Sequence, residues 1–117
     1  MAGIRGAPDS DPFLYSQPGT DVKLSATIIT YNEERNISRA IESLRCADEI
    51  VVVDSGSSDR TVEIAEKLGA RVVDSAWPGY AKQKNYAAEC ATHDWILSLD
   101  ADESLSEALE EIGRAHV

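Results

Sequence analysis

Short apolar segments alternate with amphipathic segments along most of this chain, and this alternation limits the fold more than any other feature. Four segments rich in apolar or β-branched residues are expected to be strands: residues 24–30, 49–53, 71–74 and 94–99. The stretches between them repeat apolar residues at helical spacing, the pattern of a helix packed on one face. The alternation predicts a parallel sheet with right-handed crossovers and helices on both faces, a three-layer α/β domain.

Several residues indicate where the predicted helices begin and end. A first helix is expected from Glu33 to Arg45, with Asn32 as its N-cap. Gly69 is expected to stop the second helix. Ser104 and Glu107 have the spacing of a capping box at the start of a last helix.

The composition excludes some functions. A chain of 117 residues allows one domain with a modest core. Its formal net charge of -10 argues against a nucleic-acid partner, which needs a basic surface. A phosphate ligand stays compatible with this charge, because a bound metal can supply positive charge. Cys46 and Cys90 match no metal-ligand spacing and are expected to be reduced, buried thiols, with one disulfide as the alternative.

The two ends of the chain differ from its centre. Residues 1–21 hold three of the 4 prolines and little apolar periodicity, which predicts a disordered or loosely attached tail. No apolar stretch approaches the ~20 residues that span a bilayer, and the first residues lack the layout of a signal peptide, so a cytoplasmic location is expected. Residues 111–117 spell the translation of a common sequencing-library adapter. We therefore expect a truncated reading frame with a non-native tail at residues 113–117.

Residues able to bind a ligand follow three of the predicted strands. The segment from Thr30 to Glu34 ends the first strand, Asp54 ends the second, and Asp100 and Asp102 follow the fourth. Because ligands bind outside the carboxyl ends of parallel strands, these residues are expected to meet in one cleft. Two carboxylates one residue apart suit a hard divalent cation, which is often shared with substrate phosphates. The sequence thus predicts a cation site for a phosphorylated substrate.

Each of these residues also has a simpler interpretation. An Asp-x-Asp pair occurs by chance in acidic loops, and Asp54 is also the kind of residue that ends a strand in a turn. Tyr31 can be a strand-end aromatic, and Lys84 can belong to a solvated helix face. For Trp77, packing is more usual than sugar stacking. The convergence of three strand ends on one sheet edge outweighs these interpretations.

Four stretches of the sequence carry a family resemblance. They are Ala26 to Glu34, Ile50 to Thr61, Gly79 to Asn85 and Asp94 to Glu103. Together they resemble the inverting family 2 glycosyltransferases of the GT-A fold, in the family's order. The segment Trp77-Pro78-Gly79-Tyr80 is most similar to bacterial lipopolysaccharide-core sugar transferases. The resemblance implies that residues 22–112 form a nucleotide-sugar-binding, Rossmann-like half of a GT-A domain.

The resemblance implies a phosphate end and a base end for the cleft. Asp102 would coordinate Mg²⁺ or Mn²⁺ bridging the donor's diphosphate, with Asp100 near the ribose or the metal's waters. Lys84 would contact the diphosphate at a position where the family usually has arginine. Asp54 would accept a hydrogen bond from the nucleobase or the ribose. The base pocket would be lined by Thr30, Tyr31 and Glu33.

The resemblance also implies a reaction. A sugar would pass from a nucleoside-diphosphate donor, most often a UDP-sugar, to a glycan or lipid-linked acceptor of the lipopolysaccharide core or a similar cell-surface polysaccharide. The full-length protein would touch the inner face of the cytoplasmic membrane peripherally. In the family the general base lies beyond the position of residue 117, so this chain alone is expected to be inactive. The alternatives are a non-catalytic, doubly wound nucleotide- or cation-binding or signalling domain, such as a receiver-like module, and a calcium-stabilised structural domain.

Overall fold

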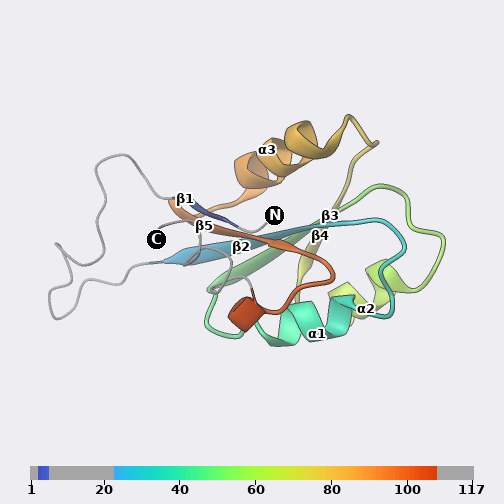
Figure 1. Ribbon diagram of the computed structural model, residues 1–117, viewed down its shortest axis with the longest axis horizontal. Coiled ribbons are helices and arrows are strands. Elements are labelled where there is room, and N and C mark those ends of the chain that lie inside the picture. Colours follow the sequence, from blue (N-terminus) through green and yellow to red (C-terminus); the bar gives the residue numbers. More distant parts are fainter. Residues whose placement is uncertain (1–2, 6–22, 108–117) are drawn as a thin grey trace, which may run out of the picture.

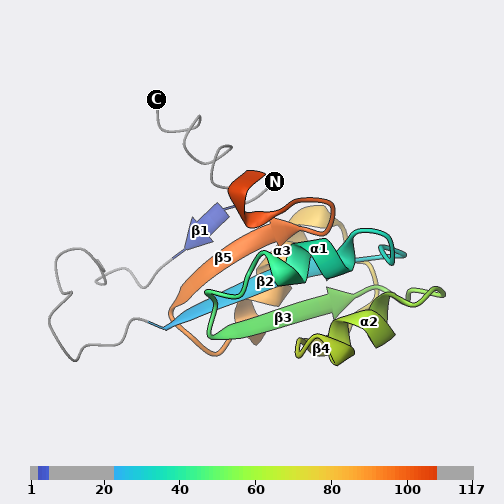
Figure 2. The ribbon, with the colours of Figure 1, turned by 90° about the horizontal axis from the view of Figure 1, so that it is seen from below.

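The chain folds into three layers, with a mixed sheet between helices (Figure 1). The computed structural model describes residues 3–5 and 23–107. The strands are β1 (Gly3–Arg5), β2 (Leu24–Thr30), β3 (Glu49–Asp54), β4 (Arg71–Asp74) and β5 (Trp95–Asp100). The helices are α1 (Ile37–Glu42), α2 (Thr61–Lys67) and α3 (Tyr80–Cys90). Helices α1 and α2 cover one face of the sheet and α3 covers the other (Figures 1 and 2), which confirms the predicted three-layer α/β architecture.

The sheet order brings the carboxyl ends of three strands together. The order is β1-β5-β2-β3-β4, and β2 pairs in parallel with both β5 and β3. In the register of these pairs, Thr30 lies opposite Asp54 and Ile29 lies opposite Asp100. The ends of β5, β2 and β3 are therefore neighbours along one edge of the sheet, as the sequence predicted.

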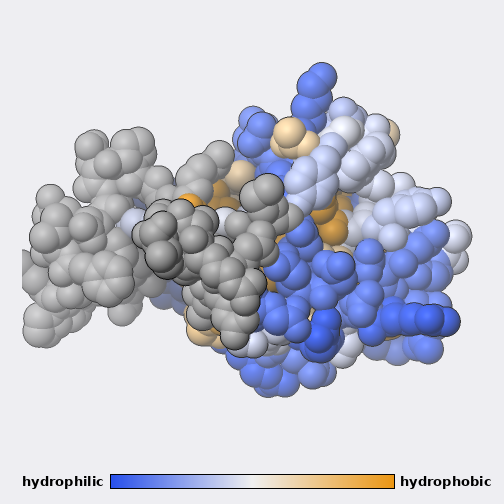
Figure 3. All heavy atoms as spheres, in the orientation of Figure 1, coloured by the Kyte–Doolittle hydropathy of each residue, from blue (hydrophilic) through white to orange (hydrophobic). Residues whose placement is uncertain are grey.

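Apolar side chains fill the space on both faces of the sheet. Ile28, Val52 and Leu97 belong to a cluster with residues of α1 and α2, whereas Val51 and Val53 pack with Ala87 of α3. Successive residues of a strand point to opposite faces, so strands covered on both sides read as continuous apolar runs. The outer surface over α1 and α2 is hydrophilic (Figure 3), because the apolar stripe of each helix faces the sheet.

The N-terminal residues depart from the predicted tail. Residues 3–5 form β1, which pairs antiparallel with β5 and sets Gly3 opposite Ser98. An edge strand presents a row of unpaired N–H and C=O groups, and a short extended segment satisfies them. The sheet is therefore parallel in β2 to β5 and antiparallel only at this edge. The other residues of the expected N-terminal tail, and the expected non-native residues 113–117, lie outside the described residues.

Helix α1 is shorter than predicted. It covers Ile37–Glu42 and not the expected 33–45. Asn32, the expected N-cap, has φ 51 and accepts a hydrogen bond from the Ser58 N–H at 2.8 Å instead. The amide of Asn32 is therefore committed to the neighbouring loop, and the residues after it form turns before the helix begins.

Other local predictions have mixed outcomes. Gly69, with φ 92, follows α2 as predicted. The capping box is confirmed, because the Ser104 N–H donates to Glu107 Oε2 at 3.2 Å and the Glu107 N–H donates to Ser104 Oγ at 3.5 Å. Both cysteines are free thiols, but neither is fully buried as predicted: Cys46 is exposed in the turn after α1, and Cys90 at the end of α3 is half-buried. Within the described residues, every helix is too short or too polar to cross a membrane.

Candidate functional site

The loops that follow β2 and β3 are joined by hydrogen bonds. The Asn32 N–H donates to Ser57 Oγ at 2.8 Å, in addition to the contact between its side chain and Ser58. The Glu33 N–H donates to Thr61 Oγ1, also at 2.8 Å. The left-handed backbone of Asn32 is a conformation that asparagine tolerates better than most residues. This edge of the sheet is therefore braced by contacts within the protein itself.

Asp54 and Thr30 hold one another beneath these loops. Thr30 Oγ1 donates to Asp54 Oδ1 at 2.7 Å. The other carboxylate oxygen of Asp54 accepts from the N–H groups of Gly56 at 3.1 Å and Ser57 at 2.8 Å. Asp54 is only 1% exposed and Thr30 is also buried. Their polar atoms thus organise the loop after β3, and a direct contact between Asp54 and a nucleobase stays a prediction.

Asp100, the last residue of β5, forms an ion pair with a lysine of α3. The Lys84 ammonium is 2.9 Å from Asp100 Oδ1, and the Tyr80 hydroxyl donates to the same oxygen at 2.9 Å. Lys84 Nζ also lies 5.1 Å from the centre of the Tyr80 ring, a cation–π distance. Partial burial acts to raise the pKa of Asp100, but hydrogen bonds, including those from Lys84 and Tyr80, outweigh it and hold that pKa well below its usual range. Asp100 is thus ionised at neutral pH.

Asp102 lies in the turn after β5, with its side chain exposed. Its backbone carbonyl accepts a hydrogen bond from Arg39 Nη2 at 2.7 Å. Glu103 folds back on the strand end, where its Oε1 accepts from the Asp100 N–H at 3.2 Å and its own N–H donates to the Asp100 carbonyl at 2.9 Å. The turn is held through its backbone, so the Asp102 carboxylate stays available to a ligand.

Among the residues that the structure describes, three cavities can be followed along this edge of the sheet. One of ≈ 240 Å³ is lined by Thr30, Tyr31, Glu33, Trp77, Asp100 and Asp102, and so unites five of the seven predicted site residues. A second, of ≈ 390 Å³, is lined by Tyr31, Ser55 and Trp77. The third, of ≈ 270 Å³, includes Asp54 and Ser55. Because neighbouring cavities share lining residues, they lie side by side along this edge, and together they are called the cleft here. Lys84 lines a different cavity, of ≈ 380 Å³, and reaches the cleft through its contact with Asp100.

Two aromatic residues of the cleft were not predicted from the sequence. Trp77 is 55% exposed and lines two of the cavities, so it does not belong to the core; a stacking role for this residue stays a prediction. Tyr80 is the hydroxyl donor to Asp100 described above. Both belong to the loop and helix start that follow β4. An aromatic residue in a loop at the carboxyl edge of the sheet, beside Pro78 and Gly79, was the signal available in the sequence.

An open α/β sheet whose carboxyl edge combines paired carboxylates with exposed aromatic rings has the arrangement of a ligand-binding α/β domain. Residues 25–112 match the family model of Glycosyl transferase family 2, and the chain belongs to that family. It is 52% identical over 90 residues to an uncharacterized glycosyltransferase of Rickettsia conorii, an alignment that covers 76% of this chain and 32% of that protein. The lipopolysaccharide core biosynthesis glycosyltransferase LpsC of Rhizobium meliloti is 42% identical over 98 residues, covering 76% of this chain and 35% of LpsC.

Solved structures agree with the family. Glucosyl-3-phosphoglycerate synthase from Mycobacterium tuberculosis, crystallised with Mn²⁺, uridine diphosphate and glucosyl-3-phosphoglycerate, superposes with a TM-score of 0.62 at 26% identity, covering 71% of this chain and 36% of that one. S. aureus TarS gives a TM-score of 0.62 at 31% identity, covering 81% and 33%. The chain therefore spans about a third of the length of the curated relatives it matches.

Proposed function

We propose that this chain forms the donor-binding part of a glycosyltransferase that moves a sugar, with inversion, from a nucleoside diphosphate to a glycan or lipid-linked acceptor. The observation that carries the proposal is the ≈ 240 Å³ cavity, which joins the Tyr31 ring to the carboxylates of Asp100 and Asp102. A nucleoside diphosphate presents a flat base, a ribose and a diphosphate in that order. The cavity offers an aromatic surface for the first and a place for a cation on the last.

Exposed aromatic rings support the base end of this proposal. Tyr31 is 59% exposed and Trp77 is 55% exposed, and both line the adjoining ≈ 390 Å³ cavity with Ser55. Stacking of a base on an aromatic side chain contributes about 1–3 kcal/mol. Tyr31 comes from the loop after β2 and Trp77 from the loop after β4, so the two rings offer surfaces from different segments. A pyrimidine or purine base can cover either of them.

The described residues fit a divalent cation that is shared with the donor. Among residues 3–5 and 23–107, no group of three or more His, Cys, Asp or Glu side chains is close enough to hold a metal alone. One or two carboxylates completed by substrate phosphates is the usual arrangement for Mg²⁺. Asp102, exposed at the cleft, would be the direct ligand, with Asp100 near the ribose or the metal's waters. A bound cation would act as a Lewis acid and stabilise the charge that grows on the leaving diphosphate.

Lys84 supports the phosphate end from the protein side. Its ammonium is largely shielded, with a side-chain exposure of 16%, and it lies 2.9 Å from Asp100. Burial acts to lower the pKa of Lys84, but the Asp100 carboxylate and Tyr80 outweigh it and raise that pKa. Lys84 therefore keeps its charge at neutral pH. Because the ammonium is paired with Asp100, it offsets one of the two carboxylate charges that a diphosphate would meet at this end of the cleft.

We further propose uridine diphosphate as the nucleotide and the lipopolysaccharide core, or a similar cell-surface polysaccharide, as the acceptor class. The first is supported by the mycobacterial synthase, which was crystallised in complex with uridine diphosphate and Mn²⁺. The second is supported by the name of the LpsC relative. Membership of a glycosyltransferase family counts against the receiver-like alternative.

Titration calorimetry with uridine diphosphate and Mn²⁺ tests the proposal. We expect wild-type protein to bind the nucleotide more tightly with Mn²⁺ than with EDTA. Asp102→Asn should weaken Mn²⁺-dependent binding at least about tenfold, since even indirect partners of a metal ligand have effects of that size. Asp94→Asn is the matched control, because Asp94 is exposed and lies just before the opposite end of β5. Equal binding by wild type and Asp102→Asn would refute the proposal, and a response to Ca²⁺ without nucleotide would favour a structural cation site.

A further inference from the structure

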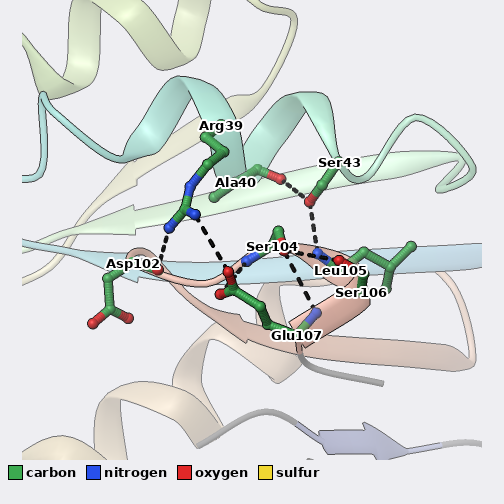
Figure 4. A network of polar contacts seen from close by, with 8 residues as sticks. All are labelled: Arg39, Ala40, Ser43, Asp102, Ser104, Leu105, Ser106 and Glu107. Atoms are coloured by element: carbon green, nitrogen blue, oxygen red, sulfur yellow. Dashed lines mark hydrogen bonds and ion pairs between the residues drawn. The ribbon is translucent and has the colours of Figure 1, made fainter. Parts of the chain in front are cut away.

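Arg39 of α1 holds the turn that carries Asp102. Its Nη2 donates to the Asp102 carbonyl oxygen at 2.7 Å, and its Nη1 lies 3.3 Å from Glu107 Oε1 (Figure 4). The guanidinium thus contacts the segment at the turn that carries Asp102 and again five residues later, at Glu107. A cationic donor to a carbonyl is stronger than a neutral one, so the first contact is well suited to fix the backbone.

A second side chain of the same helical face continues this attachment. Ser43, four residues after Arg39, accepts a hydrogen bond from the Leu105 N–H at 2.9 Å and donates to the Ala40 carbonyl at 2.7 Å. Leu105 also packs against the main apolar cluster. The segment after β5 is therefore attached to α1 and to the residue that follows it through three contacts, two made by Arg39 and one by Ser43. The contact between Arg39 and the Asp102 carbonyl is the one at the turn itself.

The contact acts on the backbone and leaves the carboxylate available. Figure 4 shows the Asp102 side chain pointing away from the guanidinium, which faces the carbonyl oxygen. Glu107 balances the charge of Arg39, so Arg39 does not take part in neutralising the cleft. From the other side, Glu103 holds the Asp100 backbone, as described above. The turn between the two carboxylates is thus fixed at both ends by residues outside the cavity lining.

We infer that Arg39 is a positioning residue: its hydrogen bond to the Asp102 carbonyl sets the direction of the Asp102 carboxylate and so the strength of cation-dependent diphosphate binding. The inference rests on the proposed function. Without the guanidinium, the turn gains freedom, and this freedom is lost again when a cation binds. The base end of the cleft is formed by Tyr31 and Trp77 on other loops, so it should not respond.

The test compares two ligands on the whole chain. Calorimetry measures the binding of uridine diphosphate with Mn²⁺. In a Trp95→Phe background, the fluorescence of Trp77 follows the binding of uridine without metal. For Arg39→Met we expect roughly tenfold weaker binding of uridine diphosphate with Mn²⁺, and unchanged binding of uridine. Arg39→Lys, which keeps a positively charged donor group, should recover part of the loss. Arg35→Met is the matched control, because Arg35 is exposed in the turn before α1.

The outcomes separate the two proposals. Wild-type affinity in Arg39→Met would overturn the positioning role and leave the proposed function standing. An equal loss for uridine and for uridine diphosphate would overturn it too, since a general structural defect affects both ligands. The lack of any recovery in Arg39→Lys would also overturn it, since the proposed contact needs only a donor at this position. Failure of wild-type protein to bind uridine diphosphate with Mn²⁺ would overturn the proposed function, and this inference with it. A thermal unfolding curve for each variant checks that it is folded.

Discussion

Glu49 connects three strands at the edge of the sheet opposite the cleft, and its removal is the most quantifiable perturbation of the scaffold. Its carboxylate accepts hydrogen bonds from Ser25 Oγ at 2.8 Å, from the Thr92 N–H at 2.8 Å and from Thr92 Oγ1 at 2.7 Å. Arg71 Nη2 lies 3.3 Å from the same carboxylate. One side chain thus joins β2, β3 and β4 to the segment that enters β5.

These donors determine the charge state of Glu49. Partial burial acts to raise its pKa, but the donors from Thr92, Ser25 and Arg71 outweigh burial and lower that pKa from 4.5 to about 2. A difference of this size corresponds to at most about 3 kcal/mol of stabilisation. Solvent screening reduces it, because the Arg71 side chain is 47% exposed, and we expect about 1–2 kcal/mol.

The sign of the pH dependence follows from the lowered pKa. The stabilisation is fully present above the pKa of the unfolded chain, near 4.5, and is lost as the pH falls toward the folded-state value of about 2. Urea denaturation of wild type and Glu49→Gln between pH 7 and pH 3 therefore measures it. The free energy of unfolding should differ by about 1–2 kcal/mol at neutral pH, and the difference should shrink below pH 4.5.

The control for this experiment is Glu66→Gln, an exposed carboxylate on α2. Its difference from wild type should stay near zero at every pH. A difference for Glu49→Gln that does not change with pH would show that the hydrogen bonds of the carboxylate do not depend on its charge. An equal pH dependence in Glu66→Gln would assign the effect to net charge, and either result would refute the reasoning.

Two further predictions concern an aromatic ring and a backbone conformation. Trp77→Ala should weaken binding of uridine diphosphate about tenfold, because base stacking is lost, and unchanged affinity of this variant would contradict the stacking role. In a separate Trp95→Phe variant, the remaining fluorescence of Trp77 should be quenched by uridine. Gly69→Ala should lower the free energy of unfolding by about 1–2 kcal/mol, because Gly69 has φ 92, a conformation that strains a residue with a Cβ. An added Cβ would have no atom within 4 Å, so backbone strain is the only effect expected. Urea denaturation measures this effect.

The parts of the fold that depend on apolar pattern could be predicted from the sequence. The range predicted for β2 matches the structure, and β3 and β5 each extend to the acidic residue at their carboxyl end, Asp54 and Asp100. Strand ends in a parallel sheet converge whatever the loops do, which is why the cavity contains the predicted Tyr31 and Asp102. The parallel pairing of β2 with β3 and of β3 with β4 fits the predicted strand–helix–strand crossovers.

The parts that depend on side-chain hydrogen bonds could not be predicted. Asn32 is equally suited to cap a helix or to hold a left-handed turn, and contact with Ser58, 26 positions later, decides between them. Arg39 has the pattern of a solvated helix position, and only the folded chain places it beside a carbonyl acceptor 63 positions away. β1 was missed because three residues carry too little periodicity to predict a strand.

Loop bracing and ring exposure at the cleft together argue that a ligand completes this site. Burial of an aromatic side chain contributes roughly 1.5–3 kcal/mol, yet Tyr31 and Trp77 remain more than half exposed on the edge where Asn32 and Asp54 tie the loops together. Folding alone gains little from apolar rings in that position. A planar ligand that covers them recovers the burial on binding, and the braced loops reduce the ordering cost of that step. The same edge carries the two carboxylates, so the ligand that gains most has a flat end and a cation-binding end.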